Sequence, residues 1–118
     1  MKPGGGIAGA RNRSAGVAAI AEAEAPVVNV SRSKYPESAR HIDDAVAAGQ
    51  PSVLTIDRAG AASRRQDAMK GTKTTPGTDR DEYPPALFSD GGEGASVRPI
   101  SPSDNRGAGA CIGAQCRA

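Results

Sequence analysis

The sequence predicts a small α+β domain whose second half runs strand, turn, strand and helix. Three observations support this fold class. The 118 residues suffice for one domain with a thin core, because a domain of this size buries only about two-thirds of its unfolded surface. Short β-prone runs alternate with segments of helical apolar periodicity. The 15 glycines and 9 prolines break the chain often, so long regular elements are not expected.

The N-terminal segment, residues 1–25, is expected to be a flexible leader or linker before a domain at residues 26–118. It carries cationic side chains and then an apolar run, Gly16 to Ala21, which Glu22 ends. A secretory signal needs about 7 to 15 apolar residues at this point, so the run is at best a degraded signal. No stretch approaches the length of a transmembrane helix, and we expect no membrane association.

The first elements of the domain are predicted to be a strand and a helix. The valines within residues 25–30 favour an extended conformation. Residues 36–48 have the features of a helix, with Pro at the first position and Gly49 as a stop. Ile42, Ala45 and Val46 give the i, i+3, i+4 stripe that would face the core.

A second strand and helix should follow. Residues 52–56 form a compact β-prone run, and residues 61–70 form a polar helix that Gly71 closes. Residues 72–78 contain Pro and Gly but no apolar side chain, so they are expected to form an exposed loop.

An acidic cluster at residues 79–82 is the most informative local feature. Three carboxylates and one guanidinium stand side by side, shortly before the stiff pair Pro84-Pro85. Like charges this close raise one another's pKa, and a nearby cation or metal relieves the repulsion. A protein can obtain a carboxylate base in this way, whereas most charge runs are simply solvated faces.

The last part of the chain is predicted to be a hairpin followed by a helix. The glycine-rich residues 90–94 are expected to join residues 86–88 and 95–98 as two short antiparallel strands. Residues 101–105 are rich in helix-capping side chains and precede a short helix at residues 108–117. Glycines weaken this helix, unless they let it pack closely against the hairpin or a phosphate backbone.

The two cysteines, Cys111 and Cys116, are expected to be free thiols. On a helix their spacing separates them by roughly 140°, so a disulfide would require a broken helix. No second Cys/His pair stands near them, and a structural zinc site is therefore not expected.

The order of these segments, and the residues in them, resemble the bacterial NucA/NucB family of secreted and sporulation endonucleases. The similarity covers residues 34 to 116 and implies a small ββα-metal nuclease core, similar in architecture to the HNH group. The resemblance also implies an additional strand and helices around this core, with the family's last strand apparently missing after Ala118. It rests on short matches in order and at family-like spacing: Ser33–Glu37, His41-Ile42, Asp44-Ala45, Thr55–Arg58, Gly60-Ala61, Arg64-Arg65, Lys70-Gly71, Asp79–Glu82, Gly91-Gly92, Gly94–Arg98 and Asp104–Gly109.

The resemblance implies that Asp81 is the general base, in the role that His fills in most HNH enzymes. Glu82 is the alternative, because the Asp-Arg-Gly-His motif of another ββα-metal group would align its His with Glu82. Asn105 is a further candidate catalytic residue. His41, the only histidine of the chain, is expected to have a helix-surface or packing role, since nothing nearby in sequence would orient it.

The same resemblance implies one divalent ion, Mg²⁺ or Mn²⁺, on the scissile phosphate. Such folds hold the ion with few protein ligands, usually from the final helix, and water completes the shell. Gln115 occupies the matching place, and its amide oxygen is a weaker ligand than a carboxylate. Asp104 and Asn105 are the alternative ligands.

DNA is the implied partner, although a net charge of +2 is too small to identify it. Arg80, Arg98 and Arg106 are expected to clamp phosphate with their guanidinium forks. Arg64, Arg65 and Lys70 would extend this track along a duplex backbone without reading the base sequence. A solvated helix face is the alternative interpretation of the Arg64-Arg65 pair.

Two other functions stay open at this stage. A truncated, catalytically inactive DNA-binding module would fit the missing strand and the weak ligand Gln115. A nuclease warhead of a bacterial toxin would have an inhibitor or immunity protein as a partner. The resemblance implies an extracellular, secreted protein, and we expect a monomer.

Overall fold

A two-stranded antiparallel sheet forms the centre of the fold. The computed structural model describes residues 25–117, so the leader expected at residues 1–25 lies almost wholly outside the described residues. β1 (Asp79–Tyr83) and β2 (Ser96–Ile100) pair so that Asp81 stands opposite Arg98 and Tyr83 opposite Ser96. Directly opposed residues share a face of the sheet, so one face carries the side chains of Asp79, Asp81 and Tyr83.

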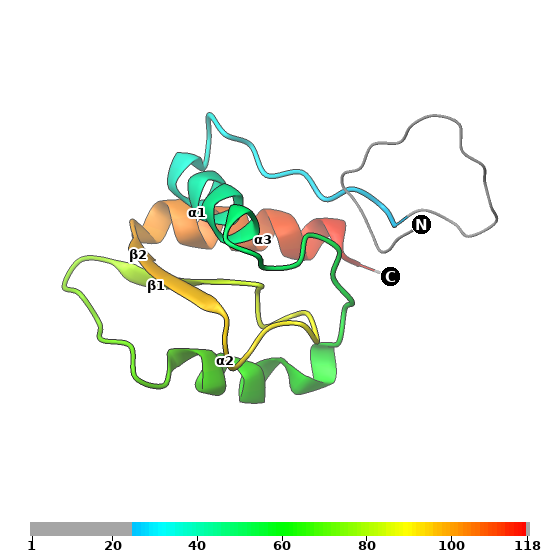
Figure 1. The fold of residues 1–118 in the computed structure, drawn as a ribbon. Helices are drawn as coiled ribbons and strands as arrows, with labels where there is room; N and C mark the ends of the chain where they lie inside the picture. The colour runs from blue at the N-terminus through cyan, green and yellow to red at the C-terminus, as the bar shows by residue number, and fades with distance from the viewer. Residues whose placement is uncertain (1–24, 118) are drawn as a thin grey trace.

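Helices cover both faces of this sheet. α1 (Pro36–Ala47) and α3 (Pro102–Gln115) lie on one side of it, and α2 (Ala61–Met69) lies on the other (Figure 1). A 3-10 turn, Arg58–Gly60, leads into α2. The α+β class is therefore confirmed, and the order strand, strand, helix is present as β1, β2 and α3.

The core between these layers is thin because most of its side chains are small. Five alanines are buried, and the larger apolar contributions come from Tyr83, Phe88 and Ile100. Charged and polar groups fill part of the interior, with Ser38, His41 and Asp104 all buried. A core this small leaves the fold dependent on hydrogen bonds between its elements.

The predictions of a strand at residues 25–30 and of another at residues 52–56 are both wrong. Residues 25–30 form no strand, and the backbone N–H of Asn29 instead donates to the side chain of Gln115, 2.9 Å away. Residues 52–56 supply only an isolated bridge between Ile56 and Phe88. β-Propensity was present in both runs, but a strand also needs a partner along its length, and β2 pairs with β1 instead.

A hairpin was expected to pair residues 86–88 with residues 95–98. The second strand is present as β2, but the prediction that residues 86–88 form the first strand is wrong. The acidic cluster itself forms β1, and residues 84–95 make the long connection to β2. Pro84 and Pro85 lack the backbone N–H groups that would continue the ladder, so β1 ends at Tyr83.

Helix positions were predicted more accurately than strands. α1 and α2 match the expected ranges to within one residue at each end, and Gly49 follows α1 with a φ of 113°. The buried face of α1, however, centres on His41 and Ala45 rather than on the expected stripe through Ile42 and Val46.

The final helix begins six residues earlier than expected. Pro102 opens α3, where its missing N–H costs nothing and its fixed φ suits the first turn. Gly107 has a packing reason, because a Cβ there would collide with the ring of Tyr35. Gly109 and Gly113 have open space around them, so close packing explains only the first of the three glycines.

Candidate active site

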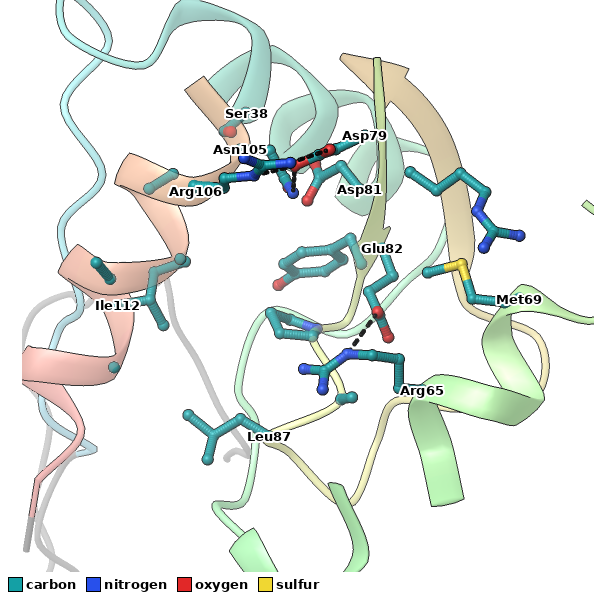
Figure 2. Close-up of a pocket in the computed structure, with 18 of the residues that line it drawn as sticks. Ser38, Arg65, Met69, Asp79, Asp81, Glu82, Leu87, Asn105, Arg106 and Ile112 are labelled. Carbon is teal, nitrogen blue, oxygen red and sulfur yellow. Dashed lines mark hydrogen bonds and ion pairs between the residues drawn. The ribbon is translucent and has the colours of Figure 1, made fainter. Parts of the chain in front are cut away.

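An open groove runs along the free edge of β1. It has a volume of about 1370 Å³ and is lined by β1 itself, by α2 on one side and by α3 on the other. Figure 2 shows Asp79, Asp81 and Glu82 of β1 between Arg65 and Met69 of α2 and Asn105, Arg106 and Ile112 of α3. The acidic cluster is therefore presented to a cavity by a strand, and both flanking helices contribute cations to it.

Asp81 is held by a residue from another element. The Nδ1 atom of His41, on α1, lies 2.7 Å from Asp81 Oδ2, and the Nε2 atom of His41 lies 2.9 Å from the hydroxyl of Ser96 on β2. The imidazole is fully buried, while the side chain of Asp81 remains 19% exposed. No hydrogen bond reaches the other carboxylate oxygen, Oδ1, from residues 25–117. Asp81 thus has one oxygen fixed and one oxygen free at the groove.

Asp79 forms a compact polar cluster with α3. Arg106 donates from Nε and Nη2 to its two carboxylate oxygens, at 2.9 and 3.1 Å, and the amide of Asn105 donates to Oδ2 at 3.0 Å. These bonds, first from Arg106 and then from Asn105, hold the pKa of Asp79 below its usual range. The cluster and Asp81 lie at the same end of the groove (Figure 2).

Glu82 has a different environment from its neighbour Asp81. Its Oε1 atom is buried and has no hydrogen-bond partner, and its Oε2 atom lies 3.6 Å from Nε of Arg65. Burial raises the pKa of Glu82, Arg65 opposes that shift, and the charge of Asp81 adds to it. A carboxyl group with one oxygen desolvated in this way is a costly feature for a fold to keep.

Several predicted cationic residues line the groove. The Arg80 guanidinium donates to the backbone and hydroxyl oxygens of Thr72, and Lys70 pairs loosely with Asp67 at 3.4 Å. The side chains of Arg65 and Arg106 are 63% and 73% exposed. Arg65, Lys70, Arg80 and Arg106 are therefore brought together around the carboxylates.

The two other predicted arginines are engaged away from the groove. Arg98 pairs with Asp44 of α1 at 3.0 Å, on the face of β2 that α1 covers. Arg64 is largely buried and donates to the carbonyl of Ala86 and to the carboxylate of Asp57. Through the bond to Ala86, Arg64 ties α2 to the β1–β2 connection.

The predicted metal ligands are not brought together. The carboxylate of Asp104 is buried against the first turn of α1, where it accepts bonds from Glu37 and Ser38. The amide of Gln115 bonds to the backbone of Asn29 at the far end of α3. Neither side chain lines the groove, whereas Asn105 does.

The oxygen atoms left at the groove fit a hard divalent ion. Residues 25–117 contain no group of three His, Cys, Asp or Glu side chains that could hold a metal ion, so an ion at the groove would have fewer protein ligands than that. Asn105 uses its amide N–H on Asp79, which leaves its amide oxygen available beside two carboxylates. Mg²⁺ commonly takes only one or two protein oxygens and keeps several waters, and this donor set meets that requirement.

Sequence reasoning missed the contribution of His41 and Ser96. His41 was expected to have a helix-surface or packing role. The helix-surface role is wrong, because His41 is fully buried, and it also contacts the candidate base directly. A usable signal was present, because His41 stands four residues before Ala45 and so lies beside the apolar stripe of its helix. A titratable side chain at such a position needs a buried partner.

Two further predictions concerned the cysteines and membrane association. Cys111 and Cys116 are free thiols, as expected. Within the described part of the chain, no helix is long and apolar enough to cross a membrane.

Comparisons with known proteins give a consistent result. The family model described as deoxyribonuclease NucA/NucB matches residues 34–116. A curated relative from Bacillus subtilis (strain 168), named DNA-entry nuclease, is 54% identical over 80 residues, which make up 68% of this chain and 54% of the relative. The chain therefore spans about half the length of this relative.

Proposed function

The chain belongs to the NucA/NucB deoxyribonuclease family, and from this premise we propose that it binds DNA along the β1 groove and cuts phosphodiester bonds as a metal-dependent endonuclease. The single observation that carries the proposal is the state of Asp81. One of its oxygens is fixed by a buried histidine, and the other is free at a groove lined with cations. A general base needs this combination of a fixed position and an open acceptor.

The proposed reaction uses residues of β1 and α3. Asp81 Oδ1 accepts a proton from a water molecule while the water oxygen attacks phosphorus. The bond from phosphorus to the leaving oxygen breaks, and that oxygen takes a proton from solvent. When bound, a divalent ion, Mg²⁺ or Mn²⁺, withdraws charge from the phosphate and stabilises the transition state. Asn105, with Asp79 beside it, would hold this ion.

The cationic side chains support phosphate binding without sequence recognition. Arg106 and Arg80 would contact the oxygens of the scissile phosphate, and Arg65 and Lys70 would contact neighbouring phosphates of the backbone. Guanidinium and ammonium groups that face only the backbone carry no information about bases. We therefore propose cleavage with little sequence preference.

Conversion of supercoiled plasmid to nicked and linear forms tests this function. The wild type is expected to nick DNA with Mg²⁺ or Mn²⁺ and to stop in excess chelator. Asp81→Asn should abolish nicking, because the amide keeps an acceptor for His41 but no longer takes a proton from water. Asp43→Asn removes an exposed carboxylate that pairs with Arg32 on the far side of α1, and this matched control should keep full activity.

The alternative base is tested in the same assay. Glu82→Gln is expected to retain most activity, because the free oxygen of Glu82 is buried rather than open to water. Loss of nicking in Glu82→Gln, with Asp81→Asn still active, would reverse the assignment. Activity in both variants would contradict a carboxylate base on β1.

A DNA-binding module without catalysis is the second candidate function. It is favoured by one observation, namely that Gln115, the ligand expected from the family resemblance, lies outside the groove. Such a module would retain DNA at low salt and release it at high salt without producing nicks. A folded wild type that binds DNA but leaves plasmid intact with either metal would support it.

A further inference from the structure

We propose that His41, supported by Ser96, is a positioning residue that orients Asp81 for catalysis. The inference rests on the proposed function and concerns how its base is held. His41 does not line the groove, and Asp81 is the proposed reacting group that it contacts, so it would act on the reaction through Asp81.

The geometry fixes which nitrogen of His41 carries the proton. An ionised Asp81 has no hydrogen to give, so the contact at 2.7 Å requires a proton on Nδ1 of His41. When the imidazole carries only this proton, Nε2 is an acceptor, and the hydroxyl of Ser96, 2.9 Å away, is placed to donate to it. A bond donated by Ser96 to Nε2 would favour the same tautomer that the contact with Asp81 requires.

The two contacts also fix the position of the carboxylate. Ser96 stands opposite Tyr83 and two residues from the partner of Asp81, so His41 of α1 bridges a diagonal pair across the two strands. The side chain is fully buried, which limits its motion. With Oδ2 of Asp81 fixed by this bridge, Oδ1 is directed to the groove.

Packing alone does not account for a histidine at this place. Burial of an imidazole costs free energy unless both nitrogens are hydrogen-bonded, and an apolar side chain would fill the same space without that requirement. Both nitrogens are satisfied here, and one of them is satisfied by the carboxylate that has a free oxygen at the groove.

Kinetics of plasmid nicking provide the first test. His41→Leu is expected to lower kcat about 10- to 100-fold, the usual cost of removing the partner that orients a reactive group, while KM for DNA changes little. His41→Asn places an amide N–H where Nδ1 was and should recover most of the loss. Ser96→Ala should give a smaller loss in kcat than His41→Leu.

A matched control separates positioning from stability. Ala45→Gly destabilises α1 one turn beyond His41 without touching Asp81, so it should lower the melting temperature and leave kcat unchanged. If the wild type nicks DNA and His41→Leu does so with the same kcat, the positioning role is overturned while the proposed function stands. If His41→Leu fails to fold, His41→Asn and Ser96→Ala carry the same comparison.

The tautomer gives a second readout that does not depend on activity. Because His41 is the only histidine of the chain, long-range ¹H–¹⁵N spectra of the imidazole contain one set of signals. The wild type should carry a proton on Nδ1, and Ser96→Ala should weaken this preference. A neutral imidazole with its proton on Nε2 would overturn the proposal. A wild type that shows the Nδ1 proton but never nicks DNA would instead contradict the proposed function.

Discussion

Asp104 is expected to stabilise the fold rather than to bind metal, and its replacement by alanine tests this distinction. Its carboxylate accepts bonds from the backbone N–H of Glu37 at 2.9 Å, from the N–H of Ser38 at 3.0 Å and from the Ser38 hydroxyl at 2.6 Å. The two N–H groups belong to the first turn of α1, where no helical partner exists for them. Asp104 therefore joins α3 to the N-terminus of α1 through a buried contact.

The magnitude follows from these three bonds. Loss of an N-cap side chain alone costs about 0.5 to 2 kcal/mol, and a buried carboxylate with three donors should exceed that range, at about 3 kcal/mol. For a domain of this size, 1 kcal/mol corresponds to a shift in melting temperature of roughly 4 to 8 °C, so Asp104→Ala should melt roughly 12 to 24 °C below wild type. Asp104→Asn keeps one acceptor oxygen, so its melting temperature should lie between those of wild type and Asp104→Ala.

Thermal unfolding followed by circular dichroism, with and without Mg²⁺, measures the effect. Asp43→Asn is the matched control, since it removes a half-exposed carboxylate from α1 and should change stability by only about 0.5 kcal/mol. Asp104→Ala that melts like wild type but no longer responds to Mg²⁺ would refute the structural role. It would restore Asp104 as the metal ligand that the sequence indicated.

The same contact predicts a pH dependence. Burial raises the pKa of Asp104, but the bonds from Ser38 and Glu37 outweigh burial and hold it below its ordinary value of 3.8. A lowered folded-state pKa contributes stability that is present above the unfolded value and is lost as pH falls through the folded value. The difference in melting temperature between wild type and Asp104→Ala should therefore be constant near neutral pH and shrink below pH 3.8.

Four further perturbations test other parts of the site. Glu82→Gln should raise the melting temperature at neutral pH, because the raised pKa of Glu82 means that its ionisation destabilises the fold as pH rises; unchanged melting at neutral pH would contradict this. Arg65→Ala should reduce the slope of log K for DNA binding against log salt by about 1 and leave the melting temperature unchanged. Arg64→Ala is the matched control. It should lower the free energy of unfolding by about 1 to 3 kcal/mol and leave the salt slope unchanged, because Arg64 donates to Ala86 and Asp57. Equal salt slopes in the two variants would refute the difference in their roles. Excess chelator should stop nicking while circular dichroism still reports a folded chain, and an unfolded chelated sample would show that the ion is structural.

The helices could be predicted from the sequence because their signals are local. Pro36 and Gly49 mark the ends of α1, and Gly71 follows α2, so each boundary is encoded within a few residues of itself. Strands lack this property, because a strand exists only where another segment pairs with it. Residues 25–30 have high β-propensity and no partner strand, whereas the charged residues 79–82 have low propensity and form most of β1.

The formation of β1 by charged residues has a physical reason that propensity omits. Each carboxylate on the strand meets a partner from a different helix: Asp79 meets Arg106 of α3, Asp81 meets His41 of α1, and Glu82 meets Arg65 of α2. Successive residues of a strand point to opposite faces, so the adjacent carboxylates of Asp81 and Glu82 are directed to different helices, which reduces the repulsion between them.

This alternation also explains how much of the site the sequence could reveal. The identity of Asp81 and Glu82 as candidate bases was accessible from the cluster and the family resemblance, but their difference was not, because it arises from which helix each residue faces. His41 is 40 residues from Asp81 in the chain, and Ser96 is 55 residues from His41. Only the packing of α1 against the β1–β2 face brings the three together. Asp81 and Glu82 are adjacent carboxylates of nearly equal chemistry, but their surroundings differ. Asp81 has an open oxygen and a second oxygen held by His41, whereas Glu82 has a buried oxygen without a hydrogen-bond partner. This difference favours Asp81 over Glu82 as the proposed base.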